Sequence, residues 1–280
     1  MIQTATQLKD KIKNLSGGNG TKAQLLLRNY MMERFLARIA LSKYKDNFIL
    51  KGGMMVAALV GTQARTTMDI DTTIRAITLN ADEVKKIVEE IATIDVEDGV
   101  TFEIKNVSDI MEEHDYPGIR ITMDAYLQKL RQAIKIDIST GDEITPEAIR
   151  YTYKLMFDQG DISIWTYNLE TLMAEKLETI MARGTANTRM RDFYDVHTIW
   201  IEKATYINME ILKIAFQNTA QKRGTKHLIA SVKDIIKEVE LNAEAQKNWG
   251  NFRKENQYVG ELTWEEVINT VKSVLDLVWQ

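Results

Sequence analysis

The spacing of apolar positions changes twice along the chain, and each change predicts a different kind of structure. Residues 22–42 carry apolar side chains every three or four positions, from Leu25 to Ala40, which predicts a long helix. Residues 3–14 predict a shorter helix. The segment Ser16–Gly20 between them predicts a flexible turn, with Thr21 as the candidate N-cap of the second helix.

Short β-rich segments separated by turns dominate the middle of the chain. An amphipathic helix over residues 82–93, opened by Asn80 or Asp82, interrupts them. The last two segments flank Asp158–Asp161, whose composition suits a hairpin. Strands at such intervals around one or two helices predict an α/β sheet layer. The predicted strands are Phe48–Leu50, Ile70–Ile77, Val100–Val107, Gly118–Tyr126, Gln132–Ser139, Tyr151–Phe157 and Ile162–Trp165.

The strand pattern ends before Leu169, and the remainder of the chain predicts five or so helices. Their breaks are expected at Gly184, Thr205–Asn208, Gly224, Asn248–Gly250 and Gly260. We therefore predict a bilobed α+β protein. Residues 1–165 form its α/β lobe, with a helical N-terminal segment over residues 1–45, and residues 166–280 form its helical lobe.

Composition excludes several classes of protein. A hydrophobic fraction of 45% and a charged fraction of 27% are globular, unlike disordered or collagen-like chains. The longest apolar run, about eight residues around Met54–Val60, is too short for a membrane span. The absence of cysteines and the spacing of the three histidines argue against zinc and thiol sites. With no secretory signal at the start, we expect a cytoplasmic protein in which carboxylates hold any metal.

The net charge of −4 hides a marked asymmetry along the chain. Residues 1–51 hold ten basic and three acidic side chains, whereas residues 52–166 hold 11 basic and 21 acidic ones. One interpretation is a basic helical face that neutralises an acidic neighbour. The other is a carboxylate-rich metal centre flanked by a basic surface for a polyanion.

Three aspartates are candidates for a metal site. Asp69 and Asp71 stand two residues apart at the start of a predicted strand, so both carboxylates leave the same face and can share a divalent cation. Asp137 lies on the polar side of an alternating strand, opposite Ile136 and Ile138. If the two strands are neighbours, three carboxylates converge. The alternative for Asp137 is an ordinary solvent-facing residue.

Two further features could bind phosphate. Gly52 and Gly53 follow a short strand and precede a helix, where exposed backbone N–H groups suit phosphate oxygens, although such a pair often forms only a tight turn. Lys176 lies within the apolar stripe of the helix over residues 169–183 and therefore needs an anion, unless its amine reaches out to solvent. Asp192 and Asp195 in the next helix could simply complement the helix dipole.

An ordered set of motifs runs from about residue 22 to residue 200: Arg34–Arg38, Phe48–Gly53, Arg65–Asp71, Lys135–Asp137, Glu175–Lys176 with Arg183–Gly184, and Arg191–Asp195. The set resembles the AbiE-type abortive-infection toxins, nucleotidyltransferase-like proteins of type IV toxin–antitoxin systems. The C-terminal 80 residues match only in being helical. The resemblance implies a polymerase-β-like nucleotidyltransferase lobe with a mixed sheet, followed by a helical lobe.

The resemblance also implies roles for individual residues. Asp69 and Asp71 would bind Mg²⁺ or Mn²⁺, with Asp137 as a less regular third acid. Gly52 and Gly53 would hold the phosphates of a nucleoside triphosphate, and Arg65 and Thr67 in the same motif are candidates for further nucleotide contacts. Lys176 would contact the triphosphate, and Asp192 would complete the motif. This chain has Gly-Gly where many relatives have Gly-Ser, so no serine hydroxyl is present there and only backbone donors can bind phosphate.

The implied activity is nucleotide transfer to an RNA acceptor, with tRNA as the first candidate. Lys222, Arg223 and Lys226 are candidate RNA-binding residues on a basic surface of the helical lobe. We expect a monomer whose cognate antitoxin need not bind it. Two rivals stay open. One is a nucleotide-binding sensor, with GTP as a candidate ligand, that has no turnover. The other is a phosphatase that uses Asp69 of the Asp69–Thr73 pattern as a covalent nucleophile, which requires a strand before the motif.

Overall fold

The computed structural model describes residues 2–61, 67–78, 80–110 and 118–279. Its internal contacts divide the chain into two compact units. The first comprises Met1–Ala58, Thr66–Asp142 and Ile149–Thr166, and the second comprises Leu59–Arg65, Glu143–Ala148 and Tyr167–Gln280.

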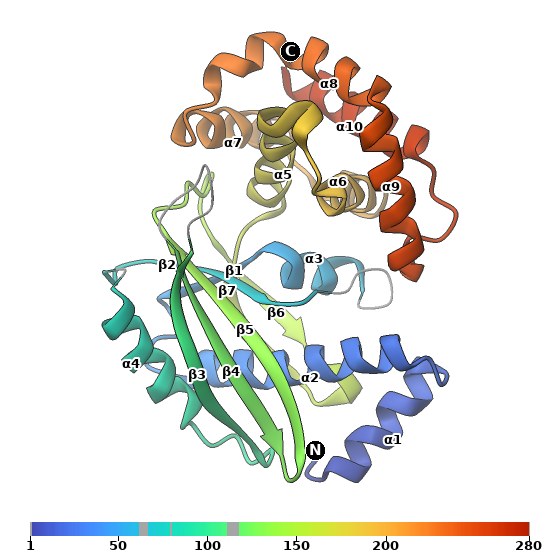
Figure 1. Ribbon diagram of the computed structural model, residues 1–280. Coiled ribbons are helices and arrows are strands. Elements are labelled where there is room, and N and C mark those ends of the chain that lie inside the picture. The colour runs from blue at the N-terminus through green and yellow to red at the C-terminus, as the bar shows by residue number, and fades with distance from the viewer. Residues whose placement is uncertain (1, 62–66, 79, 111–117, 280) are drawn as a thin grey trace. The chain divides into compact units, whose positions relative to one another are not determined.

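A seven-stranded mixed sheet forms the centre of the first unit (Figure 1). Its strands lie in the order β3-β4-β5-β2-β1-β7-β6. The pairs β2–β5 and β1–β7 are parallel, and the other four pairs are antiparallel. The strands are β1 (Phe48–Lys51), β2 (Ile70–Ile74), β3 (Val100–Ile110), β4 (Gly118–Leu127), β5 (Leu130–Thr140), β6 (Ile149–Lys154) and β7 (Asp161–Thr166). The predicted hairpin is confirmed in the antiparallel pair β6–β7.

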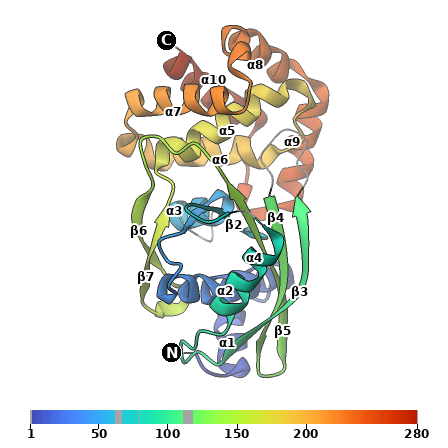
Figure 2. The same cartoon turned by 90° about the vertical axis from the view of Figure 1, so that its left-hand side faces the viewer.

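Among the described residues before β3, the helices are α1 (Ala5–Ser16), α2 (Gly20–Leu41), α3 (Gly52–Val60) and α4 (Ala81–Ala92). Figure 2 shows α2 and α4 on the same side of β3, β4 and β5. The N-cap of α2 is Asn19, whose side chain accepts from the Lys22 N–H, so the prediction of Thr21 was wrong by two residues. Asn80 caps α4 as predicted.

The core of the first unit follows from the alternation along β5. Ile134, Ile136 and Ile138 are buried, while Asp137 between them is only half-buried on the other face. A buried ion pair joins α2 to the start of β3, because Arg38 donates two hydrogen bonds of 2.9 Å to the Asp98 carboxylate. This basic residue near the C-terminus of α2 therefore has a structural contact inside the first unit.

The second unit is helical, and no strand occurs in it within the described residues. Its helices are α5 (Leu169–Arg183), α6 (Met190–Lys203), α7 (Met209–Lys222), α8 (Val232–Leu241), α9 (Ala243–Glu255) and α10 (Trp264–Trp279). The predicted helix breaks at Gly184, Gly224 and Gly260 are confirmed, and all three glycines have positive φ. The expected break at Asn248–Gly250 was wrong, because α9 continues through it. The break lies instead at Asn242, which caps α9.

The α+β class predicted from the sequence is confirmed. None of the described helices combines the length and the apolar composition of a bilayer-spanning segment.

Candidate active site

Three carboxylates converge where β2 and β5 run side by side. The parallel register places Asp71 directly beside Asp137, and Asp69 precedes β2 by one residue. One oxygen from each of the three carboxylates lies within 4.8 Å of the others. The sequence pattern predicted each carboxylate separately, and the β2–β5 pairing brings them together. These three residues are called the acidic triad below.

The Gly-Gly turn allows the backbone to approach the acidic triad closely. Gly52 has φ of +61°, and a Cβ atom built on it would lie 2.1 Å from Oδ2 of Asp71. The N–H of Gly53 donates a hydrogen bond of 3.2 Å to the same oxygen. A side chain at position 52 would therefore displace the carboxylate. The Gly53 N–H, which the sequence predicted to face phosphate, contacts the triad in this structure.

The electrostatics of the triad favour a bound cation. Burial among protein atoms is the main cause that raises the pKa of Asp71 to about 7, with the charges of Asp69 and Asp137 adding to it and Lys51 opposing them. Three carboxylates this close repel one another unless a positive charge lies between them. The donor set is made of hard oxygen atoms, which Mg²⁺ and Mn²⁺ prefer. The residues present therefore fit a divalent cation.

Two basic side chains that the sequence analysis did not single out border the triad. Arg120 on β4 donates to both oxygens of Asp137, at 2.8 and 2.5 Å. Lys51 at the end of β1 forms an ion pair of 2.5 Å with Asp142. Arg120 lies in a predicted strand, but only the antiparallel register of β4 and β5 reveals that it lies opposite Asp137. No periodicity in the sequence specifies that register.

One further predicted nucleotide contact, Thr67, lies just before β2. Thr67 is buried, and its hydroxyl donates to the carbonyl oxygen of Asp69 at 3.3 Å, with Oδ1 of Asp69 at 3.4 Å. Thr67 thus contacts a triad member directly. Arg65 lies outside the described residues.

A second cluster of charged residues lies inside the helical unit. Lys176 on α5 is buried, and its amine lies 3.2 Å from Asp192 and 2.7 Å from Asp195, both on α6. Arg189 contacts Asp192 at 3.1 Å. The anion that a lysine in an apolar stripe requires is therefore supplied by α6. Asp195, a dipole-complementing acid in one interpretation of the sequence, is a full member of this cluster.

The predicted RNA-binding group does not form a uniform basic surface. Arg223 is mostly buried and forms ion pairs with Glu175 at 3.1 Å and with Glu178 at 2.7 Å. Its charge is therefore compensated within the helical unit, and the expectation that it is a surface cation is wrong. Lys222 and Lys226 are exposed.

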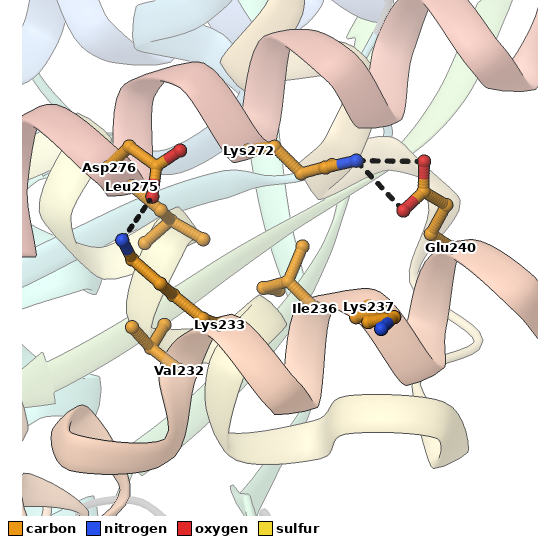
Figure 3. A pocket seen from close by; sticks show the side chains of 8 residues that line it. All are labelled: Val232, Lys233, Ile236, Lys237, Glu240, Lys272, Leu275 and Asp276. Carbon is orange, nitrogen blue, oxygen red and sulfur yellow. Dashed lines mark hydrogen bonds and ion pairs between the residues drawn. The ribbon is translucent and has the colours of Figure 1, made fainter.

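A groove of about 290 Å³ lies between α8 and α10 in the helical unit (Figure 3). Two ion pairs cross it, Lys233 with Asp276 at 3.4 Å and Lys272 with Glu240 at 2.8 Å. Because these lysines are already paired with carboxylates, the groove offers little excess positive charge to a polyanion.

A mixed sheet with a carboxylate triad beside a Gly-Gly turn agrees with the class of nucleotidyltransferases. The model of the family described as "Nucleotidyl transferase AbiEii toxin, Type IV TA system" matches residues 34–270. The chain therefore belongs to this family of toxin nucleotidyltransferases, as its motif order predicted.

Among solved structures, this chain is similar to JHP933 from Helicobacter pylori, with 16% sequence identity and a TM-score of 0.49. The match covers 91% of each chain. An antigenic nucleotidyltransferase-like protein from Paracoccidioides brasiliensis is similar at 14% identity and a TM-score of 0.40, covering 73% of this chain and 92% of the other. Among curated proteins, no sequence matches this chain.

Proposed function

We propose that this toxin uses a divalent cation, Mg²⁺ or Mn²⁺, to transfer a nucleotide from a nucleoside triphosphate to an RNA acceptor, with tRNA as the first acceptor to test. The observation that carries the proposal is the acidic triad, whose carboxylate oxygens lie within 4.8 Å of one another. Membership of the toxin family supports the cellular role, in which a cognate antitoxin counteracts the protein.

The proposed reaction is a substitution at the α-phosphorus of the triphosphate. A hydroxyl oxygen of the acceptor forms a bond to this phosphorus, the bond to the pyrophosphate oxygen breaks, and the hydroxyl proton passes to water. A divalent cation held by Asp69, Asp71 and Asp137 would neutralise charge on the phosphates and acidify the attacking hydroxyl. Arg120 fixes the orientation of Asp137 through its two hydrogen bonds.

The other site residues would bind the triphosphate, position the triad or contact the RNA. Gly52 and Gly53 would contact the triphosphate through the backbone, in addition to giving Asp71 room. Thr67 would hold Asp69 in place, and Arg65 is retained from the motif. Lys176 and Asp192 are proposed as functional residues on the family resemblance, and Lys222 and Lys226 as auxiliary RNA contacts on their exposure. We also propose residues 1–165 and 166–280 as the two domains.

The experiment incubates the pure protein with each α-³²P-labelled nucleoside triphosphate, Mg²⁺ and total cellular RNA, followed by a denaturing gel. We expect label on an RNA band of tRNA size, and none when EDTA replaces Mg²⁺. The matched pair of variants is Asp69→Asn and Asp161→Asn, because Asp161 is an exposed aspartate on β7. Label on no RNA, with all four triphosphates, contradicts the proposed acceptor.

Assays of triphosphate binding, pyrophosphate release and inorganic phosphate release separate this proposal from its rivals. A sensor would bind a triphosphate without releasing pyrophosphate. A phosphatase with Asp69 as nucleophile would release inorganic phosphate from simple esters. That reaction is disfavoured because β2 begins at Ile70, after the aspartate, whereas the phosphatase motif requires the strand before it.

A further inference from the structure

A tryptophan held between two arginines lies in the first unit, apart from the acidic triad. The guanidinium carbons of Arg75 and Arg150 each lie 4.5 Å from the ring centroid of Trp165. The indole N–H of Trp165 donates a hydrogen bond of 3.0 Å to the Asp46 carboxylate, which also accepts from Arg150. The four residues are called the arginine–tryptophan cluster below.

The sheet register places this cluster on the same face as the triad. Trp165 on β7 pairs with Ile49 on β1 and with Arg150 on β6. Lys51, two residues after Ile49, pairs with Asp71. Direct partners and residues two apart on a strand point to one face, so Arg150, Trp165 and Asp71 share it. Figure 1 shows β2, β1 and β7 side by side in this part of the sheet.

The cluster carries an excess of positive charge at the surface. Arg75, Arg150 and the neighbouring Lys45 are exposed, and Asp46 is the acidic member of the group. The hydrogen bond from Trp165, together with the charges of these three cations, holds the pKa of Asp46 below its usual range. The group therefore contains three cations and one carboxylate.

Arg75 is fixed by contacts that leave much of its hydrogen-bonding capacity open. Its Nε donates to the carbonyl oxygen of Asp46 at 2.8 Å, and its guanidinium lies over the ring of Trp165. Among the described residues, Nη1 and Nη2 of Arg75 have no hydrogen-bond partner. A guanidinium held in one orientation, with both of its NH₂ groups free on an exposed side chain, is suited to bidentate contact with a phosphate.

We infer that the arginine–tryptophan cluster binds the phosphate backbone of the RNA acceptor, upstream of the hydroxyl that receives the nucleotide. This inference rests on the proposed function, because it assigns a second contact surface for the same acceptor. The excess of cations, their exposure and their shared face with the triad select a polyanion that extends along the sheet.

The spacing between cluster and triad suits an extended polyanion that contacts both. Trp165 lies two strands away from β2 and is offset from Asp71 by two residues along the strand direction. Standard sheet dimensions then give about 12 Å between the two Cα atoms. At roughly 3.4 Å of helix axis per phosphate along one strand of a duplex, the gap corresponds to about three or four nucleotides. The reacting end of the RNA lies at the triad while the backbone behind it reaches the cluster.

The test measures the affinity of the full-length protein for labelled tRNA, with Mg²⁺ but no triphosphate, by filter binding at several salt concentrations. The double variant Arg75→Gln/Arg150→Gln should bind about tenfold to a hundredfold more weakly than wild type. The slope of log affinity against log salt should become shallower by about 0.7–0.9 for each phosphate that the variant no longer neutralises. The Kd for the triphosphate should stay within about twofold of the wild-type value, since the triad is untouched.

Two controls separate backbone binding from general charge and from folding. Lys85→Gln/Lys86→Gln removes the same charge from exposed positions on α4, which packs against β3 at the opposite edge of the sheet, and should bind RNA like wild type. Arg75→Lys/Arg150→Lys keeps the positive charges but loses the planar guanidinium groups. Its RNA affinity should lie between those of the wild type and the glutamine variant. A thermal melt of each variant reports folding.

A fluorescence measurement gives a second readout, independent of variants that alter charge. Trp165 is the only tryptophan in residues 1–199, and the other four follow it at Trp200, Trp249, Trp264 and Trp279. Titration with RNA should change the tryptophan emission of the wild type. Most of that change should be absent in Trp165→Phe, which keeps an aromatic ring for the arginines.

The outcomes discriminate between this inference and the proposed function. If the glutamine variant binds RNA as tightly as wild type, or loses triphosphate affinity instead, the inference is overturned and the proposed function stands. If wild type binds no RNA even at low salt, both the inference and the RNA acceptor are overturned. If RNA binding is lost in the glutamine variant but label never reaches RNA, the inference stands and the transfer activity does not.

Discussion

Replacement of Gly52 by alanine tests the geometry of the acidic triad at a single atom. The new Cβ would lie 2.1 Å from Oδ2 of Asp71, and real Cβ contacts do not fall below 3.0 Å. The carboxylate must therefore move by about 1 Å, and a misplacement of that size in an active site costs about a hundredfold in rate. Alanine at φ of +61° also costs about 1–2 kcal/mol of stability.

Gly160→Ala is the matched control for the backbone cost. Gly160 lies in the β6–β7 hairpin with φ of +91°, and a Cβ there would meet nothing within 4 Å. Both variants should lower the melting temperature by about 2–8 °C. Only Gly52→Ala should lower the rate of nucleotide transfer by about a hundredfold and weaken Mn²⁺ binding in a calorimetric titration. A Gly52→Ala protein with wild-type rate and Mn²⁺ affinity would refute the close approach.

Further predictions concern stability and toxicity. Burial raises the pKa of Glu33 to about 7, so its contribution to stability is present below about pH 4.5, its usual pKa, and is lost as the pH rises through 7. Between about pH 5 and pH 8, the free energy of unfolding measured in urea should therefore fall by about 2–3 kcal/mol less for Glu33→Gln than for wild type. An equal fall in both proteins contradicts the assignment. Asp71→Asn should raise the melting temperature of the metal-free protein while abolishing transfer, because it relieves repulsion within the triad; a lower melting temperature speaks against that repulsion. Expression of the wild type without its antitoxin should arrest bacterial growth and Lys176→Ala should restore it, measured as colony counts; arrest by the variant at equal protein level contradicts a role for Lys176.

The sequence predicted the parts of the site that depend on local pattern. The alternation Ile134, Ile136, Ile138 placed Asp137 on the opposite face of its strand, and this is confirmed. The Gly-Gly turn was expected to offer N–H groups, but its contact with Asp71 depends on a turn that brings Gly52 against β2. Local propensity does not specify such a contact.

Long-range pairing explains what sequence analysis missed. Arg120 reaches Asp137 because β4 and β5 pair in one register, 17 residues apart in the chain. Arg223 pairs with Glu175 and Glu178 on α5, although the sequence analysis placed it on a basic surface that binds RNA. The role of a charged residue depends on which side chains the fold brings next to it, and the sequence alone does not specify those neighbours.

Metal-dependent nucleotide transfer at the acidic triad can be measured as pyrophosphate release under single-turnover conditions, with Mg²⁺, a triphosphate and tRNA. We expect release at equal rates in wild type and Asp161→Asn, and release about a thousandfold slower in Asp69→Asn, because the triad would hold the charge-neutralising cation. Equal rates in wild type and Asp69→Asn, or equal rates with Mg²⁺ and with EDTA, would contradict it.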